Sequence, residues 1–278
     1  MPPYLEHLLQ SALLILKNST FQFFYFFGTL FIGGIVLTWI SRWTQNVFQQ
    51  FKFPNFGLYV FGVIGVPVHE LCHAIFAKVF FHDVKKIKWF DPKGKGNSYG
   101  SVTHYYNDKN FYHRLGLFFI GMGPVLLSPL FLYAIYHFLV PGAGHFDFSV
   151  ASPTKSLQVF GASLVHVKNW TSIGFYAFLY VAVCITSQME LSPEDFKIAR
   201  GGIFPFFALF LVVNSVAAAL SINMHGRFQM FIDTTFIAWI GFIALAIVLA
   251  TLNLVLCLSL MSLFNKLSGA TLINPFRR

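Results

Sequence analysis

Six long apolar runs constrain the fold of this chain more than any other feature of its sequence. They cover residues 21–40, 56–81, 115–140, 172–188, 203–220 and 236–264. A helix of about 20 apolar residues is long enough to cross the hydrocarbon core of a bilayer. Charged residues make up 10% of the chain, against about 25% in a soluble domain. We therefore predict an all-α integral membrane protein with about six transmembrane helices, in a single polytopic domain over residues 1–278.

Two segments outside these runs have recognisable patterns. Residues 82–114 are polar, and apolar and polar side chains alternate loosely on both sides of a turn-rich stretch at 91–98. Such alternation around Gly and Asn predicts a short β-ribbon after the second transmembrane helix. Residues 4–16 mix apolar side chains with Glu6, His7 and Gln10, which is typical of a helix that lies in the membrane interface.

The distribution of Lys and Arg predicts the orientation in the membrane. With six spans, the N-terminus, the ribbon, residues 187–202 and the C-terminus share one side, which carries 14 of the 19 Lys and Arg residues when Lys78 at the end of the second span is included. Cytoplasmic loops are enriched in these residues, so both termini are predicted to be cytoplasmic. The net charge of +9 thus reflects membrane topology, and we predict the lipid bilayer as a partner and no nucleic acid.

The second apolar run contains the sequence His69-Glu70-Leu71-Cys72-His73. Residues four apart lie on one face of a helix, so both imidazoles can bind the same metal ion. Glu70 lies about 100° round the helix from His69, where its carboxylate can accept a proton from water without binding the metal. This arrangement is typical of zinc hydrolases. The structural alternative is a pair of buried, hydrogen-bonded histidines, but ionisable groups at membrane depth are usually functional.

The surroundings of this motif give two further expectations. Pro67 lies just before it, and we expect a kink or a break there, with the metal-binding helix starting again at the proline. Cys72 is expected to pack against other helices rather than to bind the metal, because the two histidines already define the metal face.

A third protein ligand is needed for a catalytic zinc site, and the sequence offers several carboxylates at the same membrane face. Asp83, Asp91 and Asp108 belong to the ribbon, which holds a ligand less rigidly than a helix does. Ser192 and Pro193 predict the start of a helix, with Ser192 as its cap. Glu194 and Asp195 would then lie in its first turn, and Glu190 could reach back from the fourth span. The residues alone leave Glu190, Glu194 and Asp195 open.

Three further features accompany the histidine motif, which extends from His69 to Lys78: Gly100 to His104 in the ribbon, Gly121-Met122-Gly123-Pro124 in the third span, and an Asp at the cytoplasmic end of a later span. Together these four features resemble the site-2 protease family of intramembrane zinc metalloproteases, over about residues 56–200. The resemblance implies that Zn²⁺ is bound by His69, His73 and Asp195 and that Glu70 is the catalytic base. It also implies a membrane protein substrate, cut as a single-span segment or a peptide.

The chain departs from that family in its third-ligand motif and in its modules. Ser192-Pro193-Glu194-Asp195-Phe196 stands where the family has Asn-Pro-x-Asp-Gly or Leu-Asp-Gly. The chain also has no PDZ or CBS module of the sort that many relatives carry.

From these features we predict hydrolysis of peptide bonds within or near the membrane. The ribbon is expected either to offer an edge strand to an unwound substrate or to form a lid packed by Trp89 and Phe90.

Three other functions are compatible with the sequence. A membrane di-iron oxidase or desaturase also uses His-x-x-x-His, but it needs several such motifs, and the other histidines of this chain stand alone. A membrane scaffold or transporter could retain a vestigial zinc site, although the intact Glu70 argues against decay. A zinc enzyme of the same fold could act on a substrate that is not a peptide.

Overall fold

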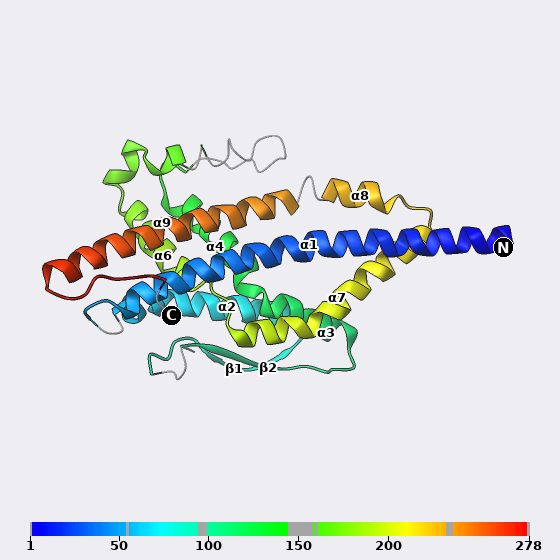
Figure 1. Cartoon of the computed structure of the whole chain (residues 1–278), viewed down its shortest axis with the longest axis horizontal. Coiled ribbons are helices and arrows are strands. Elements are labelled where there is room, and N and C mark those ends of the chain that lie inside the picture. The colour runs from blue at the N-terminus through cyan, green and yellow to red at the C-terminus, as the bar shows by residue number, and fades with distance from the viewer. Residues whose placement is uncertain are drawn as a thin grey trace.

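A computed structural model of the chain describes residues 2–53, 56–93, 99–143, 158, 161–231 and 236–276. The described chain is mostly helical, with one two-stranded antiparallel ribbon after the second long apolar segment (Figure 1). The fold class predicted from the sequence is confirmed at this level.

Four helical segments are long and apolar enough to cross a membrane. They are α1 (Pro3–Gln49), the π-helix η1 (Leu58–Gly62) continued by α2 (Val63–Val79), α7 (Pro193–Ala219) and α9 (Ile237–Leu267). A fifth is the pair α3 (Phe111–Gly121) and α4 (Gly123–Leu139), which is bent by 60°. These helices support a multi-pass membrane protein.

The fourth apolar run, residues 172–188, forms a shorter helix than the sequence predicts. It is α6 (Ile173–Thr186), whose 14 residues reach about 21 Å at 1.5 Å per residue, less than the bilayer core of about 30 Å. The 3₁₀-helix η2 (Val167–Thr171) precedes it, and α8 (Met224–Phe231) lies between α7 and α9.

Helix α1 is longer than the predicted first span. Its 47 residues form one helix that includes the segment 4–16, for which a separate interfacial helix was expected. That expectation is wrong because no Pro or Gly stands between residues 4 and 27, so nothing in the backbone ends the helix before the first span. At about 70 Å, α1 extends well past the other helices at its N-terminal end (Figure 1).

The helix that carries the histidine motif also differs from the expectation at Pro67. Helix α2 passes through Pro67 without a break. The irregularity lies about one turn earlier, in the π-helical stretch η1, where the turn of the helix is wider than in an α-helix.

Small residues in the third span bring three helices together. The bend between α3 and α4 falls at Met122, between Gly121 and Gly123. A Cβ atom on Gly121 would lie 2.5 Å from the backbone nitrogen of Ala199 in α7, and one on Gly123 would lie 3.1 Å from the backbone of Cys72 in α2. The first turns of α7 therefore lie close to the histidine-bearing part of α2.

The ribbon consists of β1 (Asp83–Lys88) and β2 (Ser101–Tyr105). The strands are antiparallel, with Ile87 opposite Val102 and an irregularity between Val84 and Lys86. They run alongside α2, on the side away from α1 and α9 (Figure 1). The predicted ribbon is confirmed, and its tip at residues 94–98 lies outside the described residues.

The two ends of the chain lie at opposite ends of α1. Helix α9 runs parallel to α1: Phe236 stacks on Phe26 at 4.8 Å, and Asn265 donates to the Gln50 carbonyl at 3.1 Å. The segment after α9 continues along this end of α1, where Gln50 donates to the Asn274 carbonyl. The described residues after α9 therefore lie far from the N-terminus along α1 (Figure 1). The predicted same-side arrangement needs six full crossings, whereas four or five helical segments of the described chain are long and apolar enough for one. The sidedness of the termini stays a prediction.

Candidate metal centre

Two histidines of α2 and an aspartate of α7 meet in the interior of the helix bundle. The His73 Nε2 atom lies 3.2 Å from Asp195 Oδ1, and the His69 Nε2 atom lies 3.7 Å from Asp195 Oδ2. The two Nε2 atoms are 3.1 Å apart. One ligand atom from each of the three residues lies within 4.8 Å of the others. His73 and Asp195 are buried, and His69 is partly buried.

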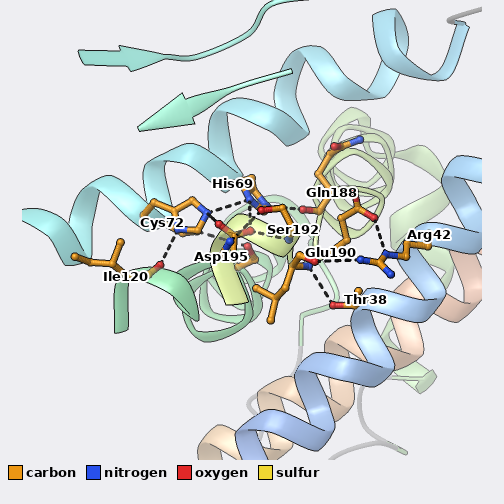
Figure 2. Close-up of polar contacts among 12 residues, drawn as sticks. Thr38, Arg42, His69, Cys72, Ile120, Gln188, Glu190, Ser192 and Asp195 are labelled. Carbon is orange, nitrogen blue, oxygen red and sulfur yellow. Dashed lines mark hydrogen bonds and ion pairs between the residues drawn. The ribbon is translucent and has the colours of Figure 1, made fainter. Parts of the chain in front are cut away.

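Backbone carbonyls hold both imidazoles in a defined orientation. His69 Nδ1 lies 2.8 Å from the Gln188 carbonyl oxygen, and His73 Nδ1 lies 2.7 Å from that of Ile120 (Figure 2). A carbonyl oxygen only accepts hydrogen bonds, so each Nδ1 carries the proton and each neutral ring has its lone pair on Nε2. Outer hydrogen bonds of this kind orient metal-binding histidines and fix their tautomers.

Asp195 is fixed by the start of its own helix. Ser192 Oγ accepts a hydrogen bond from the Asp195 backbone N–H at 3.1 Å, and Asp195 Oδ2 accepts one from the Ser192 N–H at 2.8 Å. With Pro193 in the first turn, this is a complete capping box. The predicted helix start is confirmed, and it leaves Asp195 Oδ1 directed at His73.

The structure distinguishes the three candidate carboxylates by their positions. Glu194, the residue before Asp195 in α7, is exposed. Glu190 turns toward α1, where its Oε2 lies 3.5 Å from Arg42 Nε. Burial raises the pKa of Glu190, while the Arg42 charge opposes this shift. Asp195 is the one that lies beside the two imidazoles.

Two of the three acidic residues of the ribbon, Asp83 and Asp91, pair with lysines instead. Asp83 pairs with Lys85, and Asp91 lies 3.8 Å from Lys88. Within the described part of the chain, His69, His73 and Asp195 are the one group of His, Cys, Asp or Glu side chains arranged to hold a metal ion. Cys72 is buried, with its Sγ 3.6 Å from Ser128 Oγ of α4, which agrees with the expected packing role.

Helix α1 holds the segment that leads from α6 to Asp195, a role that the sequence did not reveal. Thr38 Oγ1 accepts a hydrogen bond from the Leu191 N–H at 3.1 Å, and Ser41 Oγ donates to the Ser187 carbonyl at 2.7 Å. Arg42 donates to the Leu191 carbonyl at 3.4 Å (Figure 2). This segment carries the Gln188 carbonyl that orients His69. The helical spacing of Thr38, Ser41 and Arg42 at the end of an apolar run is the signal that could have found this contact.

Glu70 lies next to the metal-binding group and under the ribbon. Its side chain is buried, at 7% exposure. Gly100, just before β2, lies directly over it: a Cβ atom there would be 2.6 Å from Glu70 Oε1. The ribbon can approach this closely only because residue 100 has no side chain. Gly100 was part of the motif that suggested the family, but the sequence assigned it no role.

A cavity of about 680 Å³ opens beside these residues. Its walls come from α2 with His69, Glu70 and His73, from the ribbon residues Tyr99 to Val102 and His104, from a polar face of α1, and from residues 188–198, which include Asp195 at the start of α7. Cavities of this size commonly bind small molecules or short peptide segments.

The donor atoms fit a zinc ion. Two neutral imidazole nitrogens and one carboxylate oxygen form a three-ligand set that leaves a fourth position for water or substrate, as in catalytic zinc sites. Three acceptor atoms facing one another are also unfavourable without a cation or a shared proton. The cluster could therefore hold a metal ion.

Comparison of the chain with protein-family models, curated proteins and solved structures finds no match. The resemblance to site-2 proteases thus rests on the motif residues and their arrangement.

Proposed function

We propose that the protein is an intramembrane zinc metalloprotease of the site-2 protease type, which cleaves peptide bonds in or near transmembrane segments of membrane proteins. The observation that carries this proposal is the position of Glu70, buried beside the His69, His73 and Asp195 group and open to the same cavity. Two metal-binding imidazoles with an adjacent carboxylate are the parts that metal-assisted hydrolysis needs.

His69, His73 and Asp195 would hold the metal. When bound there, Zn²⁺ lowers the pKa of water and polarises the carbonyl of the bond to be cut. The Gln188 and Ile120 carbonyls keep the two imidazoles in the tautomer that binds a cation. The capping box keeps the Asp195 carboxylate in place.

Glu70 moves the proton in this reaction. Its carboxylate accepts a proton from the attacking water as the water oxygen bonds to the carbonyl carbon. The same proton then passes from Glu70 to the peptide nitrogen as the C–N bond breaks, while the second proton of the water stays on the new hydroxyl, so the products are a carboxylic acid and an amine. Gly100 lets the ribbon cover Glu70, which limits access of bulk water to this carboxylate.

The ribbon offers the best-placed surface for the substrate chain. A transmembrane helix hides its carbonyls in its own hydrogen bonds, so a substrate must unwind before it is cut. The β2 end of the ribbon lines the cavity next to Glu70, where an unwound chain can lie alongside it. The alternative of a lid packed by Trp89 and Phe90 stays open: Trp89 is 46% exposed, whereas Phe90 is partly buried, and a Cβ atom on Gly62 would lie 3.4 Å from its ring.

A proton-transfer variant tests this proposal. Glu70→Gln in the full chain should keep about one zinc per molecule and lose proteolysis, because an amide cannot accept the proton. Expressed in its native cells, this variant should accumulate uncleaved membrane proteins that the wild type removes. Proteolysis by Glu70→Gln at the wild-type rate would overturn the mechanism. Iron in place of zinc would favour an oxidase, and an unchanged set of membrane proteins would favour a scaffold or transporter.

We further propose that the ribbon and the N-terminus face the cytoplasm and that the C-terminal segment faces the opposite side. Lysines at the end of α2 and on the ribbon support the first part: Lys78, Lys85, Lys86, Lys88 and Lys109. The parallel course of α1 and α9 supports the second part.

Cysteine labelling tests this topology. Single cysteines at Glu6, Lys85 and Leu272, in a cysteine-free background, should divide between the two sides of intact cells. An impermeant reagent added outside should label Leu272→Cys alone. Equal labelling of Leu272→Cys and Lys85→Cys would restore the six-span topology, with both termini on one side.

A further inference from the structure

Three histidines gather outside the metal centre, where the ribbon meets the ends of α2 and α3. His82 is buried, at 2% exposure. Its Nδ1 lies 2.9 Å from His104 Nδ1 of β2, and its Nε2 donates to the His113 carbonyl of α3 at 2.8 Å. Phe81 has a φ of 57°, a left-handed conformation that costs a non-glycine residue about 1 kcal/mol. This turn directs His82 inward at the end of α2.

These contacts define which nitrogen of each ring carries a proton. Because His82 Nε2 donates to a carbonyl, the neutral His82 ring has its lone pair on Nδ1. His104 Nδ1 must then donate to His82 Nδ1. The neutral His104 ring is left with its lone pair on Nε2, where no described residue forms a hydrogen bond with it.

Both rings are neutral at physiological pH. Burial, together with the neighbouring His82 and His73, lowers the pKa of His104 to about 4. Burial also lowers the pKa of His82. A neutral His104 of this tautomer can accept a hydrogen bond at Nε2 but cannot donate one there, so it is unsuited to stabilise an oxyanion.

His104 also lies on the path that a substrate chain would follow. It lines the same cavity as Glu70 and His73. Gly100, which lies just before β2 and next to Glu70, precedes His104 by four residues. At about 3.3 Å per residue, the two positions are about 13 Å apart along the ribbon.

We propose that His104 is a substrate-binding residue, whose Nε2 accepts a hydrogen bond from an N–H group of an extended peptide three or four residues from the bond that is cut. His82 is a positioning residue that fixes the tautomer of His104. This inference rests on the proposed protease function and adds a subsite to it. The competing role is structural: the three histidines could simply fasten the ribbon to α3.

Peptide kinetics separate the two roles. The probe is denatured casein, cut by the purified, zinc-loaded full chain in detergent, with the cut bonds identified by mass spectrometry. A decapeptide centred on a cut bond then reaches the subsite, and a tetrapeptide around the same bond does not. His104→Phe removes the acceptor and keeps a ring, His104→Gln restores an acceptor, and His113→Phe is the matched control in the same cluster.

For the decapeptide, His104→Phe should raise KM about tenfold, which corresponds to the loss of one hydrogen bond, and should leave kcat little changed. His104→Gln should restore most of the affinity, and His113→Phe should leave KM unchanged. For the tetrapeptide, His104→Phe and wild type should have the same KM. An unchanged KM of His104→Phe on the decapeptide, or an equal rise on both peptides, overturns the inference while casein is still cut.

A spectroscopic measurement is independent of turnover. In the Glu70→Gln protein labelled with ¹⁵N-histidine, the His104 resonances, assigned by their loss in His104→Gln, should show a protonated Nδ1 and an unprotonated Nε2. Adding the decapeptide should shift Nε2. A protonated Nε2 in the free protein contradicts the inference. Absence of any Glu70-dependent cleavage of casein or membrane proteins instead contradicts the protease proposal itself.

Discussion

Helix α7 carries a buried polar cluster near each of its ends, and the two clusters are built differently. Near its C-terminal end, Asn214 donates to Gln22 Oε1 of α1 at 2.7 Å and to Ser19 Oγ at 3.1 Å. At its N-terminal end, Asp195 faces His69 and His73 of α2. Both clusters place polar side chains between apolar helices, where unpaired polar groups are costly.

The difference lies in how donors and acceptors are matched. In the Asn214 cluster every hydrogen-bond donor faces an oxygen, on Ser19, Gln22, Asn214 or the Phe210 carbonyl. In the Asp195 cluster, the imidazole N–H groups are used by backbone carbonyls, and the atoms that face one another are acceptors. A matched cluster joins helices, whereas a cluster of facing acceptors is suited to bind a cation.

The largest expected effect is on the bound zinc, which should be lost when the Asp195 cluster is altered and kept when the Asn214 cluster is altered. His69→Ala or His73→Ala should reduce zinc from about one per chain to almost none, because two ligands hold the ion poorly. Asn214→Leu should keep the zinc. Metal analysis of the purified proteins measures both. Full zinc in the two histidine variants would show that the His69 and His73 group is a structural cluster like that of Asn214.

The next effect concerns which carboxylate completes the metal site. Asp195→Asn should lose most of the zinc and all of the proteolysis, since an amide oxygen is a weaker ligand than a carboxylate. Glu194→Gln should match wild type because Glu194 is exposed. Glu190→Gln removes the partner of Arg42 and should keep its zinc. Zinc content and casein cleavage are measured for the three side by side, and full zinc and activity in Asp195→Asn would make the assignment wrong.

A smaller effect is expected where the ribbon touches Glu70. Gly100→Ala places a methyl group 2.6 Å from Glu70 Oε1, so the ribbon or the carboxylate must shift. Misplacement of a catalytic group by about 1 Å can reduce turnover about 100-fold, while the three metal ligands are untouched. Gly161→Ala is the control, since nothing lies within 4 Å of that position. Casein cleavage per bound zinc measures the effect, and equal rates for both variants would contradict a positioning role for Gly100.

The sequence predicted the parts of the molecule that depend on local pattern. Apolar runs predicted the helices, turn residues predicted the ribbon, and Ser192 with Pro193 predicted the start of α7. The His-x-x-x-His spacing predicted that two imidazoles share a face, because four residues make about one helical turn.

The rest depends on contacts between segments that are far apart in the chain. The backbone carbonyls of Gln188 and Ile120 have no sequence signal, and the approach of α1 to residues 187–191 depends on tertiary packing. Charge counting placed Arg42 on the opposite membrane side from Glu190, although the two side chains form an ion pair. Polar residues in the late spans also differ in ways that the sequence does not reveal. Asn214 and Asn253 bond between helices, whereas Thr251 bonds to the Ile247 carbonyl of its own helix.

The smallest expected effect is on stability, in the matched cluster. Asn214→Leu leaves Gln22 without its partner in an apolar environment, and interhelical hydrogen bonds in membranes contribute about 0.6 kcal/mol on average. The buried amide of Gln22 is also left unpaired, so we expect the free energy of unfolding to fall by about 1–2 kcal/mol in total. The double variant Gln22→Leu/Asn214→Leu should be more stable than Asn214→Leu alone, because replacing both partners leaves no buried polar group unpaired. Unfolding in mixed micelles gives the free energies of unfolding of the wild type, Asn214→Leu and the double variant. A double variant less stable than Asn214→Leu would mean that the two amides do not act as a pair, and the contrast between the two ends of α7 would then rest on the metal-binding cluster alone.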